Sequence, residues 1–299
     1  MSALVQLRPR SLAHESRVSG WVRRGKTSLL QARRLAEWTA RPKDWSRPAL
    51  APPEEEFPHL LYARAIPIAR SDDAAHPLLE TGKRENLKLA APRFDGLLLE
   101  PGQILSFWRV LGRAETSTGY RHGMALSSGC IVPSVGGGLC LLTNALFEAA
   151  AHLGWAIHER WGHTLQAVPA HPGELWGLDA TVFWPHVDLR VAPVDQAVRL
   201  GVRVEGAGLL LSVRAKEARK ERCELSAINE ASEPSAEGVI RTNQIRRQTF
   251  DLETGTHLHD EIIAENRRTM LTPQTQRRNC LTCRETTCSS RVLPSEHTR

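Results

Sequence analysis

The stretch 135-VGGGLCLLTNALFEAAAHLGWAI-157 decides how the middle of this chain folds. Its glycines, Gly136, Gly137 and Gly138, come directly before Cys140 and an apolar run rich in helix-forming residues. The stretch therefore predicts a helix that opens on a cysteine. A thiol in the first turn of a helix lies at the positive end of the helix dipole, beside unpaired N–H groups, and these favour the thiolate. A nucleophilic cysteine would be placed there.

Two residues further along the chain complete a candidate catalytic site. His163 lies in RWGHTLQAV and Asp179 in GLDATVFW, each on a short stretch with strand character. A thiol nucleophile needs a base that takes its proton and a third group that orients the base. Cys140, His163 and Asp179 have the residue types and the order along the chain that this chemistry requires.

Each of these residues also has a structural interpretation. The glycines could let a loop pass tightly under a sheet, and Cys140 could be a small core residue. Asp179 could pair with backbone groups or with Arg190. Four other histidines compete for the role of base: His152, His158, His171 and His186. We prefer His163 because His152 and His158 flank the end of the helix that lies away from its cysteine.

Composition places the chain among ordinary folded proteins. It has 299 residues, of which 41% are hydrophobic and 24% are charged, and its formal net charge is +6. Much of the basic excess lies in the first fifty residues, so we find no strong nucleic-acid signal in the core. No apolar run is long enough to cross a membrane, and the start MSALVQLRPRSLAHESR lacks a signal-peptide pattern. We expect a cytoplasmic protein with free thiols or a metal site rather than disulfides.

The order of expected elements predicts an α+β fold with four parts. Residues 1–50 read as a basic helical arm. It could touch an anionic membrane surface or nucleic acid, or it could dock through its few apolar residues, which is the alternative we favour. The proline-rich segment 47–58 separates it from a core at 51–200, a mostly antiparallel sheet packed on the cysteine-bearing helix. A β extension at 201–270 follows, with a hairpin turn at 205–208 and another at 253–255. Residues 271–299 form a tail.

The tail contains a second cluster of candidate functional residues. Cys280, Cys283 and Cys288 form a CxxCxxxxC pattern that could supply three corners of a tetrahedral zinc site. Cys223, Cys130, His259 or His297 could be the fourth ligand, or solvent or a partner could take that place. The alternatives are a redox-active pair in a flexible tail and an iron–sulfur cluster.

Several of these segments together resemble the VanW family, whose activity is not established. The similarity is carried by LEPGQILSFWRVLGRAETSTGYRHG, VPSVGGGLCLLTNALFEAA, IHERWGHTLQAV, DATVFWPHVDLRV and IRTNQIRRQTFDLETG. It covers roughly residues 84–290 and leaves the basic arm out. The family pattern has glutamine after the cysteine, where this chain has Leu141. If that glutamine binds an oxyanion, the backbone N–H groups at the helix start must serve instead.

The resemblance implies a family named for vancomycin-resistance gene clusters, and hence a peptide or amino-acid-derived substrate. The order of helix cysteine, strand histidine and strand aspartate is also similar to the papain-like and transglutaminase-like core, which implies acyl transfer or amide hydrolysis through a thioester. The rival hypothesis is a non-enzymatic accessory or ligand-binding protein in which the cysteine cluster binds a structural metal ion. In either case we expect ligand contacts at Gly136, Gly137, Gly138 and Asn144.

Overall fold

The computed structural model describes residues 17–40, 44–46, 53–69, 77–127, 130–164, 175–236 and 238–271. Its α-helices are α1 (Arg17–Ala40), α2 (Pro77–Ala90), α3 (Phe107–Leu111) and α4 (Cys140–His152). Its strands are β1 (His59–Pro67), β2 (Leu98–Leu99), β3 (Leu105–Ser106), β4 (His122–Ser127), β5 (Cys130–Val135), β6 (Ala156–Glu159), β7 (Arg190–Ala192), β8 (Val198–Glu205), β9 (Gly208–Ala215), β10 (Glu221–Ser235), β11 (Gly238–Asp251) and β12 (His257–Leu271).

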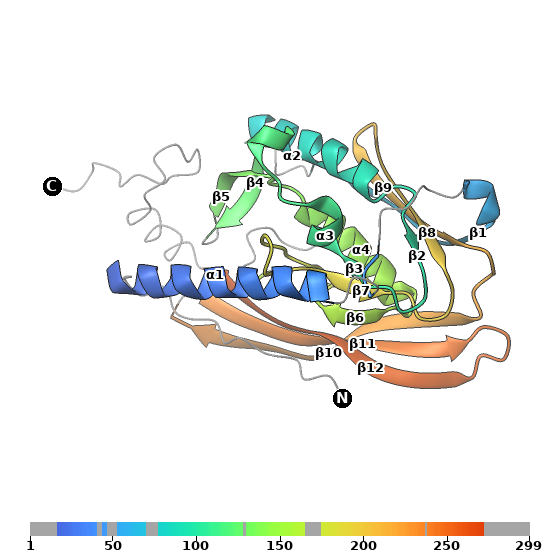
Figure 1. The fold of residues 1–299 in the computed structure, drawn as a ribbon. Helices are drawn as coiled ribbons and strands as arrows, with labels where there is room; N and C mark the ends of the chain where they lie inside the picture. Colours follow the sequence, from blue (N-terminus) through green and yellow to red (C-terminus); the bar gives the residue numbers. More distant parts are fainter. Residues whose placement is uncertain are drawn as a thin grey trace.

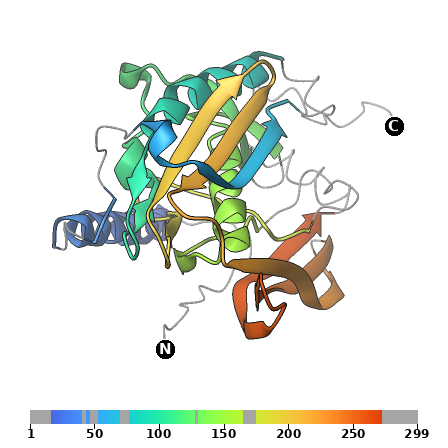
Figure 2. The same cartoon turned by 90° about the vertical axis from the view of Figure 1, so that its right-hand side faces the viewer.

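The named strands pair only antiparallel in the described part of the chain. They form a four-stranded sheet in the order β1-β9-β8-β2, two three-stranded sheets in the orders β10-β11-β12 and β3-β7-β6, and the hairpin β4-β5. Figure 1 shows the long strands β10, β11 and β12 running beneath α4 and β6. The turned view in Figure 2 separates this C-terminal sheet from the four-stranded sheet. The predicted sheet-rich α+β fold is confirmed.

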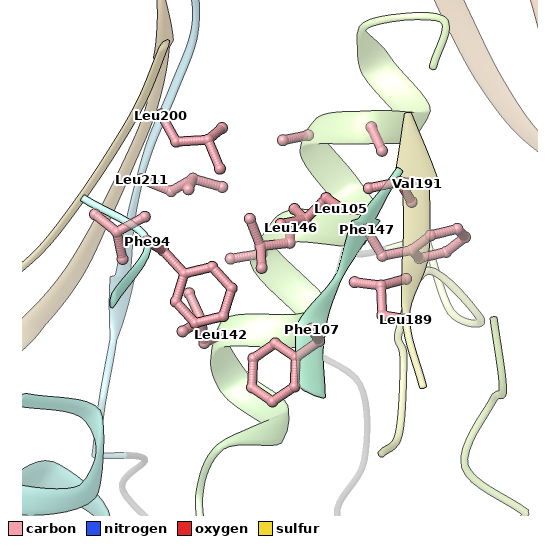
Figure 3. Packing of buried hydrophobic residues seen from close by; sticks show 14 of the residues in the cluster. Phe94, Leu105, Phe107, Leu142, Leu146, Phe147, Leu189, Val191, Leu200 and Leu211 are labelled. Atoms are coloured by element: carbon pink, nitrogen blue, oxygen red, sulfur yellow. The ribbon is translucent and has the colours of Figure 1, made fainter. Parts of the chain in front are cut away.

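Helix α4 lies at the centre of the hydrophobic core. It packs between the four-stranded sheet on one side and β3 with β7 on the other (Figure 3). Its Leu142, Leu146 and Phe147 are fully buried, and Leu200 and Val191 face them from the two sheets. Burying each such side chain stabilises the fold by about 1.5–3 kcal/mol relative to leaving it exposed. The apolar run after Cys140 therefore explains why this helix, and not another, organises the core.

The C-terminal end of α4 is capped by groups from outside the helix. Gly154 has a φ of +73°, and the N–H of Trp155 donates to Ala150 O at 3.0 Å, as in a Schellman motif. Arg219 donates to His152 O at 2.8 Å, and the buried Arg247 of β11 reaches the carbonyls of the last turn. Cations at this end complement the helix dipole. The C-terminal sheet therefore holds the end of α4 that lies opposite Cys140.

The C-terminal half of α1 docks on the core through few side chains. Arg34 is buried and contacts Glu159 with an N–O distance of 2.6 Å, and Glu37 pairs with Arg190. Trp38 is also buried and its ring centroid lies 5.8 Å from that of Trp184. Leu29, Leu30 and Leu35 are exposed, so the described part of α1 docks through Trp38 and an ion-pair cluster rather than through an apolar face.

Several expected elements differ from the observed ones. The hairpin turns at 205–208 and 253–255 lie where expected, between β8 and β9 and between β11 and β12. Strand β10 was not expected, because most of its residues are half-exposed or exposed and its polar pattern is irregular. Strand β8 crosses the expected boundary at residue 200, and the four-part division stays a prediction. Among the described helices, none has the length and apolar character needed to span a bilayer.

Candidate functional site

The loop before Cys140 is held by backbone-to-backbone packing. A Cβ atom at Gly137 would overlap the carbonyl of Gly123, and one at Gly138 would overlap the side chain of Lys83. The N–H groups of Leu139 and Leu141 donate to backbone carbonyls of this loop. Within the described residues, those of Gly138 and Cys140 donate to no other backbone group. Among the described residues, two amides at the thiol end of α4 are therefore without a backbone partner.

His163 and Asp179 come from two irregular segments that lie side by side. The N–H of Thr181 donates to Trp161 O at 2.7 Å, and the N–H of Thr269 in β12 donates to Thr164 O at 2.9 Å. Neither His163 nor Asp179 lies in a regular strand, so the expectation of strand positions for them is wrong. Single backbone bonds and side-chain contacts, rather than a ladder, fix these segments.

The side chains of His163 and Asp179 form a direct pair. His163 Nδ1 contacts Asp179 Oδ2, which also accepts the backbone N–H of His163 at 3.1 Å. Burial alone would lower the pKa of His163, but its hydrogen bonds to Asp179 and Cys140 raise it to about 9. Burial alone would raise the pKa of Asp179, but the His163 hydrogen bond and the charges of Arg160 and Arg268 hold it well below its usual range.

Cys140 faces the same pair from the start of α4. Burial alone would raise the pKa of its thiol. The hydrogen bond and charge of His163, aided by the Val182 backbone and the Thr181 hydroxyl, outweigh burial and bring the pKa below its ordinary value. Because Nδ1 of His163 faces Asp179, the nitrogen left for the thiol is Nε2. The three residues singled out in the sequence are therefore brought together in the order thiol, imidazole, carboxylate.

The polar residues after Cys140 hold the aspartate segment against the helix. Thr143 Oγ1 donates to Ala180 O at 2.6 Å, and Asn144 Oδ1 accepts the N–H of Ala180 at 2.8 Å. Both neighbours of Ala180, which are Asp179 and Thr181, are thus fixed relative to the thiol. The expected ligand role of Asn144 stays a prediction, since this oxygen already has a structural partner.

Sequence reasoning missed the residues that surround Asp179. Arg160 donates to Asp179 Oδ1 at 3.1 Å and to Asn266 Oδ1 at 2.7 Å. Arg268 pairs with the same Asp179 oxygen, and Asn266 donates to Asn243 at 2.8 Å. Burial lowers the pKa of Arg160 to about 10, although the charge of Asp179 opposes that shift. Asn266 and Arg268 are buried on one face of a polar strand, and the sequence carries no signal of that burial.

The competing assignments have other partners in the structure. His152 stacks on Tyr62 in the last turn of α4, with 5.9 Å between ring centroids, and His158 is exposed. Arg190 pairs with Glu37 and Glu159, so the pairing of Asp179 with Arg190 is wrong.

The expected zinc cluster lies outside the described residues. This holds for Cys280, Cys283 and Cys288 and for His297, one of the possible fourth ligands. Two others, Cys223 and His259, are described: Cys223 is a free thiol and His259 is exposed. Across the described ranges, no three or more His, Cys, Asp or Glu side chains are grouped so that they could hold a metal ion. The described residues thus give no support for zinc.

Known proteins share similarity with the segment that carries this site. Residues 82–213 match the model of the family described as VanW like protein. The chain is 33% identical over 139 residues to the Vancomycin B-type resistance protein VanW of Enterococcus faecalis, covering 46% of this chain and 50% of that protein. It is 29% identical over 132 residues to the Uncharacterized protein YoaR of Bacillus subtilis, covering 44% of this chain and 42% of that protein. The chain thus spans about half the length of the curated relatives it matches, and no solved structure matches it. The segment that carries Cys140, His163 and Asp179 thus matches the VanW family.

Proposed function

We propose that this protein is a cysteine-dependent acyltransferase or amide hydrolase acting on a peptide or amino-acid-derived substrate. In this proposal Cys140 is the nucleophile, His163 the general base and acid, and Asp179 the residue that orients the imidazole. The observation that carries the proposal is the contact of three side chains from three separate segments, with a lowered pKa at the thiol and a raised pKa at the imidazole.

The reaction follows from these protonation states. The opposite pKa shifts favour a thiolate on Cys140 beside an imidazolium on His163. The thiolate attacks the substrate carbonyl carbon and forms a C–S bond. His163 gives its Nε2 proton to the leaving amine as the C–N bond breaks, which leaves a thioester on Cys140. Water or an acceptor amine then attacks the thioester, His163 takes its proton, and the thiolate leaves.

The start of α4 offers donors for the oxyanion formed in each attack. The N–H groups of Gly138 and Cys140 are without a backbone partner among the described residues, and they lie at the positive end of the helix dipole. Backbone N–H donors do not depend on the side chain that follows the cysteine. This supports a functional site despite Leu141, which stands where the family pattern has glutamine.

The substrate class rests on association. One relative is described by its name as a vancomycin B-type resistance protein, and on that ground we propose a cytoplasmic cell-wall precursor as the substrate. The arrangement of a helix-start cysteine, a histidine and an aspartate is also similar to the papain-like core, which supports thioester chemistry.

The proposal is tested by labelling Cys140 with iodoacetamide across a pH series, with site-resolved mass spectrometry to separate it from the five other cysteines. We expect half-maximal labelling rates well below about pH 8.5, the ordinary thiol pKa. His163→Ala should slow the labelling and move the midpoint upward. His158→Ala, an exposed histidine of β6, is the matched control. A Cys140 that does not react, or that reacts equally in wild type and His163→Ala, would remove the thiol-enzyme proposal.

The second candidate is a non-enzymatic accessory or ligand-binding protein. The observation that favours it is the loop packing, because contacts with Gly123 and Lys83 account for Gly137 and Gly138 without any ligand. The same experiment separates the two candidates, since an accessory protein gives no reason for the thiol to depend on His163.

A further inference from the structure

One of the side chains that hold Asp179 comes from the C-terminal sheet. One carboxylate oxygen of Asp179, Oδ2, faces His163, and the other, Oδ1, receives both Arg160 and Arg268. Arg268 lies on β12, which begins at residue 257, whereas the family match ends at residue 213. Residues beyond the matched segment therefore reach the proposed catalytic pair.

The contact of Arg268 belongs to a connected network. Asn266, two residues earlier on the same face of β12, accepts from Arg160 and donates to Asn243 of β11. Asn243 in turn donates to Trp176 O at 3.0 Å, and the guanidinium of Arg268 lies 5.6 Å from the centroid of the Trp176 ring. Asn243, Asn266 and Arg268 are all buried. Buried polar groups with several partners hold each other in one geometry.

Charge gives Arg268 a role beyond packing. With Cys140 and His163 as an ion pair, the cluster of Cys140, His163, Asp179, Arg160 and Arg268 carries two negative and three positive charges. Without Arg268 the excess positive charge disappears. Arg268 holds Asp179, and a firmly held Asp179 keeps His163 in place to pair with the thiolate of Cys140. Loss of Arg268 therefore disfavours the thiolate through Asp179 and His163.

We infer that Arg268 is a positioning residue for the proposed thiol site, acting through Asp179 on His163 and thus on Cys140. The inference rests on the proposed function for its catalytic meaning. It assigns to the C-terminal sheet a part in the site in addition to its contact with the far end of α4.

The experiment compares the pH profile of Cys140 alkylation in the full chain for wild type, Arg268→Met and Arg268→Lys. Arg268→Met should move the midpoint upward by about half a pH unit or more, since one buried cation and one hydrogen bond are lost. Arg268→Lys keeps the charge and should return most of that shift. Arg267→Ala, an exposed neighbour on the same strand, should leave the profile unchanged.

A second measurement separates a positioning role from a structural one. Thermal unfolding shows whether each variant folds, and a merely structural residue would change the unfolding temperature while leaving the alkylation midpoint in place. Should Arg268→Met not fold, Asn266→Asp replaces it, because a carboxylate beside Arg160 cancels the same excess charge and should also raise the midpoint. A folded variant with the wild-type midpoint, or Arg268→Lys shifted as far as Arg268→Met, overturns the inference. If wild-type Cys140 itself is unreactive or independent of His163, the proposed function has failed instead.

Discussion

Replacing Arg247 with alanine should destabilise the protein more than replacing an exposed arginine, because this side chain joins the C-terminal sheet to the core helix. Arg247 is 2% exposed. Its guanidinium donates to Ala150 O at 3.3 Å, Ala151 O at 3.4 Å and Trp155 O at 3.0 Å, and to Glu261 Oε1 at 2.9 and 2.6 Å. It is thus both a helix cap and one partner of an ion pair.

The size of the effect follows from which groups lose their partners. Ala150 O keeps the N–H of Trp155, and Glu261 is partly exposed, so both can be satisfied after the change. The carbonyls of Ala151 and Trp155 lose the guanidinium, and an unsatisfied buried acceptor costs about 1–3 kcal/mol. Removal of a cation from the end of the helix dipole adds about 0.3–1 kcal/mol. We expect a total loss of about 2–7 kcal/mol in the free energy of unfolding.

Urea denaturation followed by circular dichroism measures this loss. The matched control is Arg246→Ala, because successive residues of a strand point to opposite faces and Arg246 donates only to Gln248 among the described partners. We expect the control to change the free energy of unfolding by less than about 1 kcal/mol. An Arg247→Ala variant as stable as the control would refute the view that β11 caps α4. A large loss in both variants would refute it as well, since it would point to the strand rather than to the cap.

Two other predictions concern the loop and a buried carboxyl. Gly137→Ala should lower the free energy of unfolding by about 1–3 kcal/mol, because its Cβ meets the rigid backbone of Gly123. The control Gly208→Ala, whose Cβ makes only ordinary contacts, should be nearly neutral. Equal melting temperatures for the two variants would contradict this prediction. Asp188 is buried and bonded to Ser106, and burial raises its pKa from 3.8 to about 7, so the folded state holds its proton more tightly than the unfolded state. The contribution of Asp188 to stability is therefore favourable at low pH and is lost as the pH rises from about 4 to about 7. Because asparagine does not titrate, the Asp188→Asn variant should gain stability relative to wild type over that pH range, as measured by urea titrations. A difference that stays flat over that range would show that Asp188 does not titrate there.

The sequence could predict the parts of the site whose causes are local. Three glycines followed by an apolar, alanine-rich run predict a helix that opens on Cys140, and the helix begins there. The hairpin between β8 and β9 was predictable because its turn contains Gly206, which adopts a φ of +53°. The order of Cys140, His163 and Asp179 suggested a thiol site, and the structure brings the three together, although not on strands.

The rest of the site depends on contacts between distant segments. Arg268 follows its partner Asp179 by 89 residues, and nothing near either residue in the sequence indicates the other. The pairing is decided by the register of β11 with β12, which sets Asn243 opposite Asn266 and turns Arg268 to the same face as Asn266. Both strands are polar, so a pattern of hydrophobicity could not show which face is buried.

The contact between Gly123 and Gly137 also limits how this chain can vary. A Cβ atom on either residue would overlap the backbone of the other, so neither position has a side chain that could shrink to make room. A substitution at one glycine cannot be compensated by a substitution at the other. Any single replacement of either glycine places a Cβ atom against the backbone of its partner. In a mutational library of this protein, glycine should therefore be strongly enriched at positions 123 and 137 among the folded members, whether or not Cys140 acts as a nucleophile.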